Sequence, residues 1–281
     1  MVMTMEISRE QIAVKTANPK QGTTRRIRAI AINTFRESVR DRVLYNLILF
    51  VLVLVGAAVF VSELSIDQES KFIADLGLSS MLVFGGLIAI FIGVGLVYKE
   101  IDKRTIYNLL SKPVHRHEFI IGKYMGLAMT LLVNSAVMVI GTELALVYAN
   151  QGPVHLQASI LPAAYLIFLE LLLLVAVALL FSSFTTPMLA ALYSFAIYII
   201  GHFSADLQLA ASLTNSTLTR YILTVFYYLL PNLANFGFIS EASHGQVVPL
   251  GMLLRVTVYA AVYIGMLLSA TTMIFQRRNF K

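Results

Sequence analysis

Ionisable side chains inside long apolar segments are the residues of this sequence that could carry chemistry. Glu170 lies near the middle of one segment, Glu143 near the end of another, and Arg255 within a third. Such charges are costly in hydrocarbon and usually mark a transport path or an ion pair. Glu170 could therefore line a polar path for a substrate, or it could pair with Arg255 and fix helix packing. For Glu143 and Arg255 we favour the packing role.

Other polar side chains of these segments give weaker signals. Asn134 shares its segment with Glu143, and we expect it to form a hydrogen bond between helices. His155, His202 and His244 could in principle bind a metal, but they are far apart in the sequence. We expect them in solvated loops and expect no metal site. The absence of cysteine excludes disulfides and thiolate ligands.

Motifs for catalysis are missing from the sequence. It has no GxxxxGK[ST] phosphate loop, no HExxH, no GxSxG and no GxGxxG. We therefore expect that the chain is not an enzyme and holds no cofactor of its own. Any energy must come from an ion gradient or from a partner.

The elements that position these residues are membrane spans. The chain is 58% hydrophobic and only 13% charged, with a mean hydropathy of +0.79; soluble domains carry about a quarter charged residues. This composition predicts an all-α integral membrane protein, because a span needs about 20 apolar residues. Six segments qualify: Val43–Val61, Leu78–Tyr98, Phe119–Tyr148, Ser159–Phe181, Pro187–Ala205 and Val247–Phe275.

The charge distribution predicts the orientation. Eighteen of the 21 Lys and Arg residues lie before the first span, within 99–123, or after the last span. Because basic residues favour the cytoplasmic side, we expect both termini in the cytoplasm of a prokaryotic cell, with the chain in its inner membrane. The net charge of +6 thus comes from basic residues expected at the cytoplasmic surface of the membrane, and we expect no nucleic-acid partner.

Segments outside the spans complete the expected organisation. Residues 1–23 read as a flexible cytoplasmic tail, and 24–281 as one transmembrane domain. Within that domain, 24–42 reads as a basic amphipathic helix on the inner leaflet, with Ile27, Ala31, Phe35 and Val39 at helical spacing. Residues 206–246 form an outer element with a re-entrant or interfacial helix. Glycines 85, 93, 122 and 126 predict close helix packing, most simply within one bundle.

The charged segment 99–117 between the second and third spans has an ordered pattern. An apolar stripe on a short helix is formed by Ile101, Thr105, Ile106, Leu109 and Leu110, and Pro113 breaks that helix. Such a stripe could lie on the membrane surface, or it could dock into a groove of another protein. The residues alone leave both readings open.

Residues 99–126 read KEIDKRTIYNLLSKPVHRHEFIIGKYMG, and this order resembles the segment between spans two and three of ABC-2 type transporter permeases. The likeness extends over most of the chain, including LLPNLANF and the basic FQRRNF end, and is greatest to the multicopper-enzyme-maturation-like branch. In that family the segment is a coupling helix that inserts into a separate ATPase subunit. The resemblance implies contact with the ATPase through Glu100, Asp102, Arg104, Thr105, Ile106, Leu109, Lys112, Pro113 and Arg116. His115 departs from the family, which often has Ser or Thr there as a helix cap.

The resemblance implies the permease subunit of an ATP-driven exporter. ATP and Mg would be bound by the partner ATPase, and a second permease copy, identical or not, would complete the membrane part among the lipids. Two alternatives stay open. One is an ion-coupled secondary carrier with Glu170 as its proton site, and the other is a membrane scaffold for assembly of another enzyme.

Overall fold

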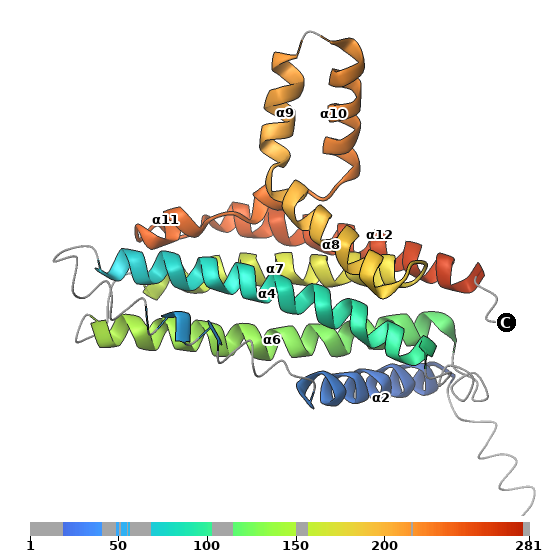
Figure 1. Ribbon diagram of the computed structural model, residues 1–281. Helices are drawn as coiled ribbons and strands as arrows, with labels where there is room; N and C mark the ends of the chain where they lie inside the picture. The colour runs from blue at the N-terminus through green and yellow to red at the C-terminus, as the bar shows by residue number, and fades with distance from the viewer. Residues whose placement is uncertain are drawn as a thin grey trace, which may run out of the picture.

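A computed structural model describes residues 19–40, 49–50, 52–54, 56, 69–102, 115–149, 157–214 and 216–277, and every element within these residues is helical (Figure 1). His155 lies outside the described residues. The elements are α2 (Pro19–Arg40), α4 (Glu69–Asp102), α6 (Arg116–Ala149), α7 (Gln157–Ser182), α8 (Pro187–His202), α9 (Ser204–Leu213), α10 (Thr217–Leu229), η1 (Leu233–Phe236), α11 (Ile239–Ser243) and α12 (Leu250–Arg277). The predicted all-α membrane fold is confirmed in this part of the chain.

Four helices are long and apolar enough to cross a membrane, at Glu69–Gly95, Arg116–Tyr148, Ala158–Ser182 and Leu250–Gln276. They correspond to the second, third, fourth and sixth predicted spans. The two pairs α8–α9 and α10–α11, each bent by more than 40°, raise the count to six if each pair is one span. Most of the predicted first span, 43–61, lies outside the described residues.

The fifth predicted span, Pro187–Ala205, is interrupted in the structure. α8 ends at His202, after 16 residues, and the chain turns at Phe203 into α9. Sixteen residues are fewer than the roughly 20 that a span needs. α9 and α10 then form an antiparallel hairpin that stands away from the bundle (Figure 1).

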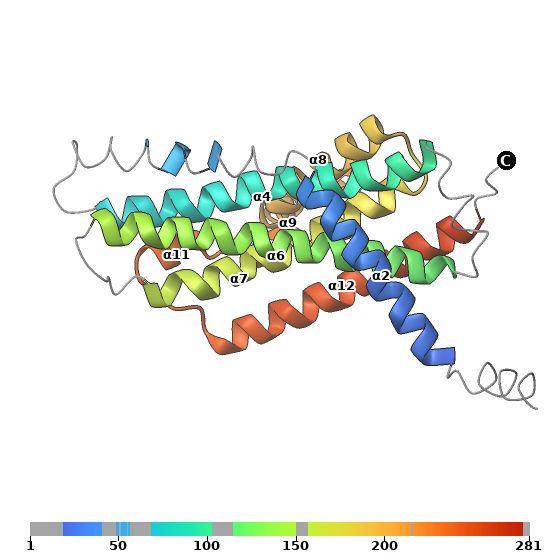
Figure 2. The same cartoon turned by 90° about the horizontal axis from the view of Figure 1, so that it is seen from below.

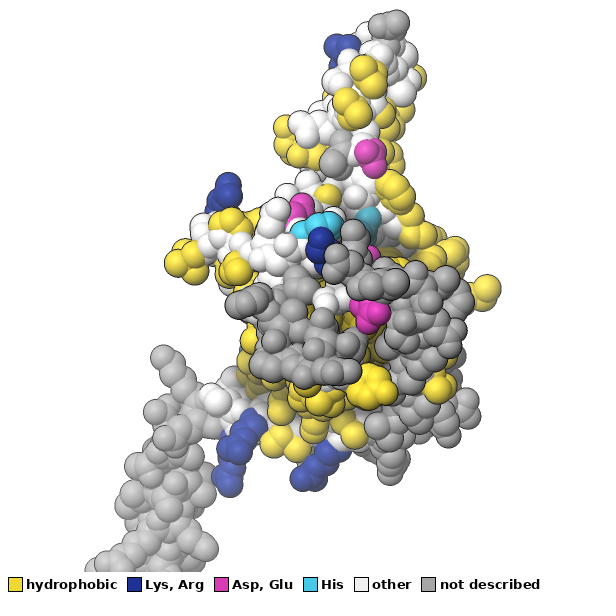
Figure 3. Space-filling model, turned by 90° about the vertical axis from the view of Figure 1, so that its left-hand side faces the viewer, with side chains coloured by type: hydrophobic (Ala, Val, Ile, Leu, Met, Phe, Trp, Pro, Cys, Tyr) yellow, Lys and Arg dark blue, Asp and Glu magenta, His cyan; other side chains and the backbone are white. Residues whose placement is uncertain are grey.

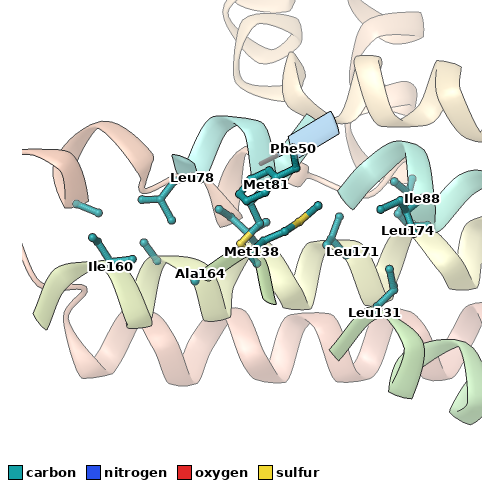
Figure 4. Packing of buried hydrophobic residues seen from close by; sticks show 14 of the residues in the cluster. Phe50, Leu78, Met81, Ile88, Leu131, Met138, Ile160, Ala164, Leu171 and Leu174 are labelled. Atoms are coloured by element: carbon teal, nitrogen blue, oxygen red, sulfur yellow. The ribbon is translucent and has the colours of Figure 1, made fainter. Parts of the chain in front are cut away.

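α7 is the central helix of the bundle. Apart from Glu170 and its first residues, it is apolar around its circumference, as is typical of a mostly buried helix. α4, α6, α8 and α12 all pack against it. Between α4 and α7 the side chains of Met81, Ile88, Leu171 and Leu174 interdigitate (Figure 4). Because lipid is as apolar as these residues, close packing rather than exclusion of water holds such helices together.

Glycine allows the closest approach of α4 to α7. A Cβ at Gly85 would lie 2.7 Å from Leu171, and a Cβ at Gly93 would lie 2.7 Å from Ala178. Contacts this short do not occur, so each position requires glycine or a displaced neighbour. The prediction that these glycines pack within one bundle is confirmed.

Candidate functional site

The described residues on either side of the predicted coupling segment lie at one end of the bundle. α4 ends there at Asp102, α6 begins there at Arg116, and α12 ends beside them (Figure 1). We call this the inner end, because the sequence predicts it to be cytoplasmic. Glu100 and Asp102 lie in the last turn of α4. Arg104, Thr105, Ile106, Leu109, Lys112 and Pro113 lie outside the described residues.

Arg116 ties the start of α6 to the end of α12. Its Nη1 donates hydrogen bonds to the carbonyl oxygens of Phe275, at 2.7 Å, and of Gln276, at 2.8 Å. The last carbonyls of a helix lack partners in their own helix and carry partial negative charge, so a guanidinium satisfies and stabilises them. Phe119 stacks on Phe275 at 5.9 Å between ring centroids and extends the junction.

Glu118 ties the start of α6 to α2. Its carboxylate is fully buried, accepts a hydrogen bond from the backbone N–H of His115 at 3.1 Å, and lies 3.3 Å from the Arg26 guanidinium. An acid three residues after the helix-capping position commonly accepts this backbone N–H. α6 therefore starts at Arg116 although its capping residue, His115, is not the family's usual Ser or Thr.

Two glycines let α2 lie directly on α6 (Figure 2). A Cβ at Gly122 would lie 2.8 Å from Ile30, and a Cβ at Gly126 would lie 2.6 Å from the backbone oxygen of Ala31. The buried face of α2 thus includes small residues, Ala31 and Thr34. Of the rest of the predicted apolar stripe, Val39 is exposed, and Ile27 and Phe35 are half-buried.

Residues of this junction were only partly anticipated. The sequence singled out Arg116 and Gly122, but it gave no role to Arg26, Glu118 or Lys123. Lys123 is buried, with Nζ 5.8 Å from the centroid of the Phe119 ring, at the distance of a cation–π contact. The available signal was charge: Glu118 lies two residues after Arg116, and Arg26 lies in the predicted amphipathic helix.

A second polar site lies in the middle of the bundle. Oε1 of Glu170, whose side chain is only 2% exposed, lies 3.3 Å from Nε2 of His202 at the end of α8. The aromatic ring of Tyr198 packs edge-on against the imidazole at 4.8 Å. The expectation of a solvated loop histidine is wrong for His202, because its side chain is 31% exposed and contacts the buried acid.

The other predicted path residues are not brought to this pair. Asn134 is buried, and its amide donates to the Thr130 oxygen at 3.0 Å within α6, so this hydrogen bond does not join two helices. Glu143 is partly buried toward the far end of α6. Arg255 is exposed, donates through Nε to the Gly251 oxygen at 3.2 Å, and lines a hollow of about 440 Å³.

Polar contacts fasten the base of the α9–α10 hairpin. The Ser204 hydroxyl donates to the Asn232 side chain at 2.6 Å, and the Asn232 backbone N–H donates to the Tyr259 hydroxyl at 2.8 Å. The Tyr263 hydroxyl donates to the Leu229 oxygen at 2.8 Å. Both legs of the hairpin are thereby connected to α12, while its apolar side chains project outward (Figure 3).

In the described part of the chain, no group of three His, Asp or Glu residues could hold a metal ion. A family model described as ABC-2 family transporter protein matches residues 28–278, which include both the inner junction and the Glu170–His202 pair. Among curated proteins, none matches the chain.

Proposed function

The chain belongs to the ABC-2 family of transporter proteins, and from this premise we propose that it is the permease subunit of an ATP-driven exporter. A separate ATPase subunit would bind ATP and Mg and hydrolyse the ATP. The permease would lie in a prokaryotic inner membrane with both termini in the cytoplasm. A second permease copy would complete the membrane part.

One observation carries this proposal. Both described boundaries of the segment 103–114 lie at the inner end, and the later boundary is bonded to two other helices, through Arg116 to α12 and through Glu118 to α2. A force applied to the segment would therefore move α6, α2 and α12 together. That is the property a lever needs if it is held by an ATPase outside the membrane.

The ATPase contact residues would be those of the coupling segment. Glu100 and Asp102 at the end of α4, Arg104 to Pro113, and Arg116 would contact the partner, with the apolar stripe of Ile106 and Leu109 entering its cleft. Glu170 and the other buried polar residues would belong to the membrane part. They have no role in ATP binding in this proposal.

Co-purification tests the proposal. The chain is expressed together with candidate ABC ATPase subunits from the same genome, and the complex is isolated before and after Leu109→Asp. We expect the charge to abolish binding of the ATPase and ATP-driven transport, because an aspartate in an apolar groove would be desolvated without a partner. Val247→Asp, at an exposed site of the opposite end, is the control. Survival of both complex and transport in the Leu109 variant would contradict the coupling role.

A further inference from the structure

The Glu170–His202 pair sits at a structural transition. His202 is the last residue of α8, and Phe203 begins the turn that leads into the hairpin. Glu170 belongs to α7, the central helix, against which α4, α6, α8 and α12 all pack. The pair is therefore a direct side-chain link between the fixed centre of the bundle and the start of the hairpin.

The imidazole contacts define which nitrogen of His202 carries hydrogen. Nδ1 lies 2.9 Å from the carbonyl oxygen of Tyr198. A carbonyl oxygen only accepts hydrogen bonds, so Nδ1 must carry the proton. In a neutral imidazole this leaves Nε2 with a lone pair, and it is Nε2 that faces Glu170.

The environment of Glu170 favours a neutral carboxyl group. Apart from Nε2 of His202, which could donate only if the imidazole were charged, no described residue donates a hydrogen bond to Oε1. A buried carboxylate without donors is very costly, whereas a carboxylic acid at the same place can donate its own hydrogen to Nε2. One proton between Oε1 and Nε2 thus satisfies both atoms without any buried net charge.

We propose that Glu170 and His202 form a proton-binding site within the membrane domain, in which protonated Glu170 donates to His202 and holds the end of α8 on α7. This site goes beyond the proposed ATP-driven transport, which needs no protonatable group inside the bundle. It makes the proton a ligand of the permease, and it requires no gradient-driven transport.

Among the described residues, no other side chain donates a hydrogen to Oε1 of Glu170 in place of this proton. The ionisable groups on the helices packed against α7 near this depth are the phenols of Tyr198 in α8, Tyr124 in α6, and Tyr259 and Tyr263 in α12. The buried Lys123 of α6 is also near, with its Nζ 5.8 Å from the Phe119 ring centroid. Tyr124 and Tyr198 donate to the backbone oxygens of Leu172 and Leu82. α4 contributes no ionisable residue between Gly77 and Val97. Arg255 of α12, Glu241 of α11 and Asp206 of α9 are exposed.

Loss of the proton would change the contact from attraction to repulsion. A carboxylate oxygen would then face the Nε2 lone pair of a neutral imidazole inside the bundle, and among the described residues no Lys or Arg forms an ion pair with it. The end of α8 would separate from α7, while Ser204 and Asn232 would keep the hairpin attached to α12. Deprotonation should therefore reorient the hairpin rather than unfold the bundle.

Infrared spectroscopy of the purified permease, without any ATPase, tests the proton directly. We expect a carboxylic-acid C=O band at neutral pH that Glu170→Gln removes and Glu143→Gln leaves in place. If that band is missing in the wild type, or is unchanged by Glu170→Gln, the proposal is wrong. Failure of the ATPase to bind would contradict the proposed function but would leave this result intact.

Distances between spin labels test the structural consequence. Because the chain has no cysteine, Tyr148→Cys on α6 and Leu213→Cys at the hairpin tip, both exposed, can be labelled specifically. We expect the distance distribution to shift when neutral pH is made alkaline. Glu170→Gln should abolish the shift and keep the neutral-pH distance, since its amide can still donate to Nε2.

His244→Asn is the matched control for that experiment. Nδ1 of His244 also lies 2.8 Å from a carbonyl oxygen of its own helix, that of Ser240, but its side chain is exposed. This variant should show the wild-type shift. A wild-type distance that is independent of pH, or a shift that persists in Glu170→Gln, would overturn the link between the proton and the hairpin.

Discussion

Arg116 is the first residue of α6, and its two hydrogen bonds to α12 give a first prediction. Arg116→Ala should destabilise the protein by about 1–3 kcal/mol, the usual contribution of a hydrogen bond to a charged group. It should also reduce ATP-driven transport more than it reduces ATPase binding, because the lever loses its connection to α12.

Thermal unfolding in detergent and transport in vesicles measure these two effects. Arg116→Lys should be intermediate, since lysine keeps the charge but lacks the planar fork that reaches two oxygens. Arg28→Ala, on an exposed face of α2, is the control. Equal stability of the Arg116→Ala and Arg28→Ala proteins would show that the contact contributes nothing.

The cap of α6 gives a second prediction. The side chain of Glu118 already satisfies the His115 N–H, whereas His115 itself is a poor cap. His115→Ser should therefore stabilise the protein by about 0.5–1 kcal/mol. Glu118→Ala should destabilise it, because the Arg26 guanidinium loses its counter-charge and the His115 N–H loses its acceptor. Chemical denaturation compares the variants, and a loss of stability in the His115→Ser protein would contradict the capping argument.

Single residues also show where the sequence stops being informative. The cost of a buried charge identified Glu170, and that argument needs only the local sequence. Its partner could not be found in this way, because His202 is brought to it by the packing of α8 on α7. A histidine at the end of an apolar segment reads as a loop residue until the position of the neighbouring helix is known.

At the scale of elements, the contact of α2 with α6 gives a third prediction. Gly126→Leu should separate α2 from α6, because the new side chain would meet the Ala31 backbone oxygen, which cannot move as a flexible side chain would. Overpacking of this kind costs about 1–3 kcal/mol. Gly95→Leu is the matched control, since nothing lies within 4 Å of a Cβ at that position.

A spin label on α2 at Arg28→Cys reports the outcome. Its mobility should rise in the Gly126→Leu protein and stay unchanged in the Gly95→Leu protein. ATP-driven transport should fall with the first substitution only. An unchanged label mobility in both proteins would mean that α2 is held by other contacts, such as Arg26 with Glu118.

The elements were predicted unequally well for a physical reason. Apolar length predicted the four long helices, and small-residue spacing predicted close helix contacts, since both are local properties. The sequence did not predict that α2 is the partner of Gly122 and Gly126. The sequence also did not predict the end of α8. There Gly201 packs against Leu233 and the Pro231 oxygen, which follow the α9–α10 hairpin in the sequence.

At the scale of the whole molecule, burial divides the helices into centre and rim. In the most apolar 18-residue stretch of α7, 72% of the residues are buried, whereas in that of α12 only 17% are buried. The exposed face of α12 includes Leu254, Val258 and Val262 at helical spacing, so it can face lipid or a second permease copy. The mobile parts of a transport cycle are accordingly expected on the rim, around a fixed α7.

Orientation in the membrane gives the last prediction, on which the proposed function depends. Cysteine substitutions at exposed Lys71 and His244 mark one end of the bundle, and a cysteine at exposed Gln276 marks the inner end. In right-side-out vesicles a membrane-impermeant maleimide should label the first two positions only, because basic residues retain their segments in the cytoplasm. Permeabilised vesicles, in which all three should react, provide the control. The reverse pattern would place residues 103–114 outside the cell, where ATP is not supplied, and a coupling role for that segment would then be physically impossible.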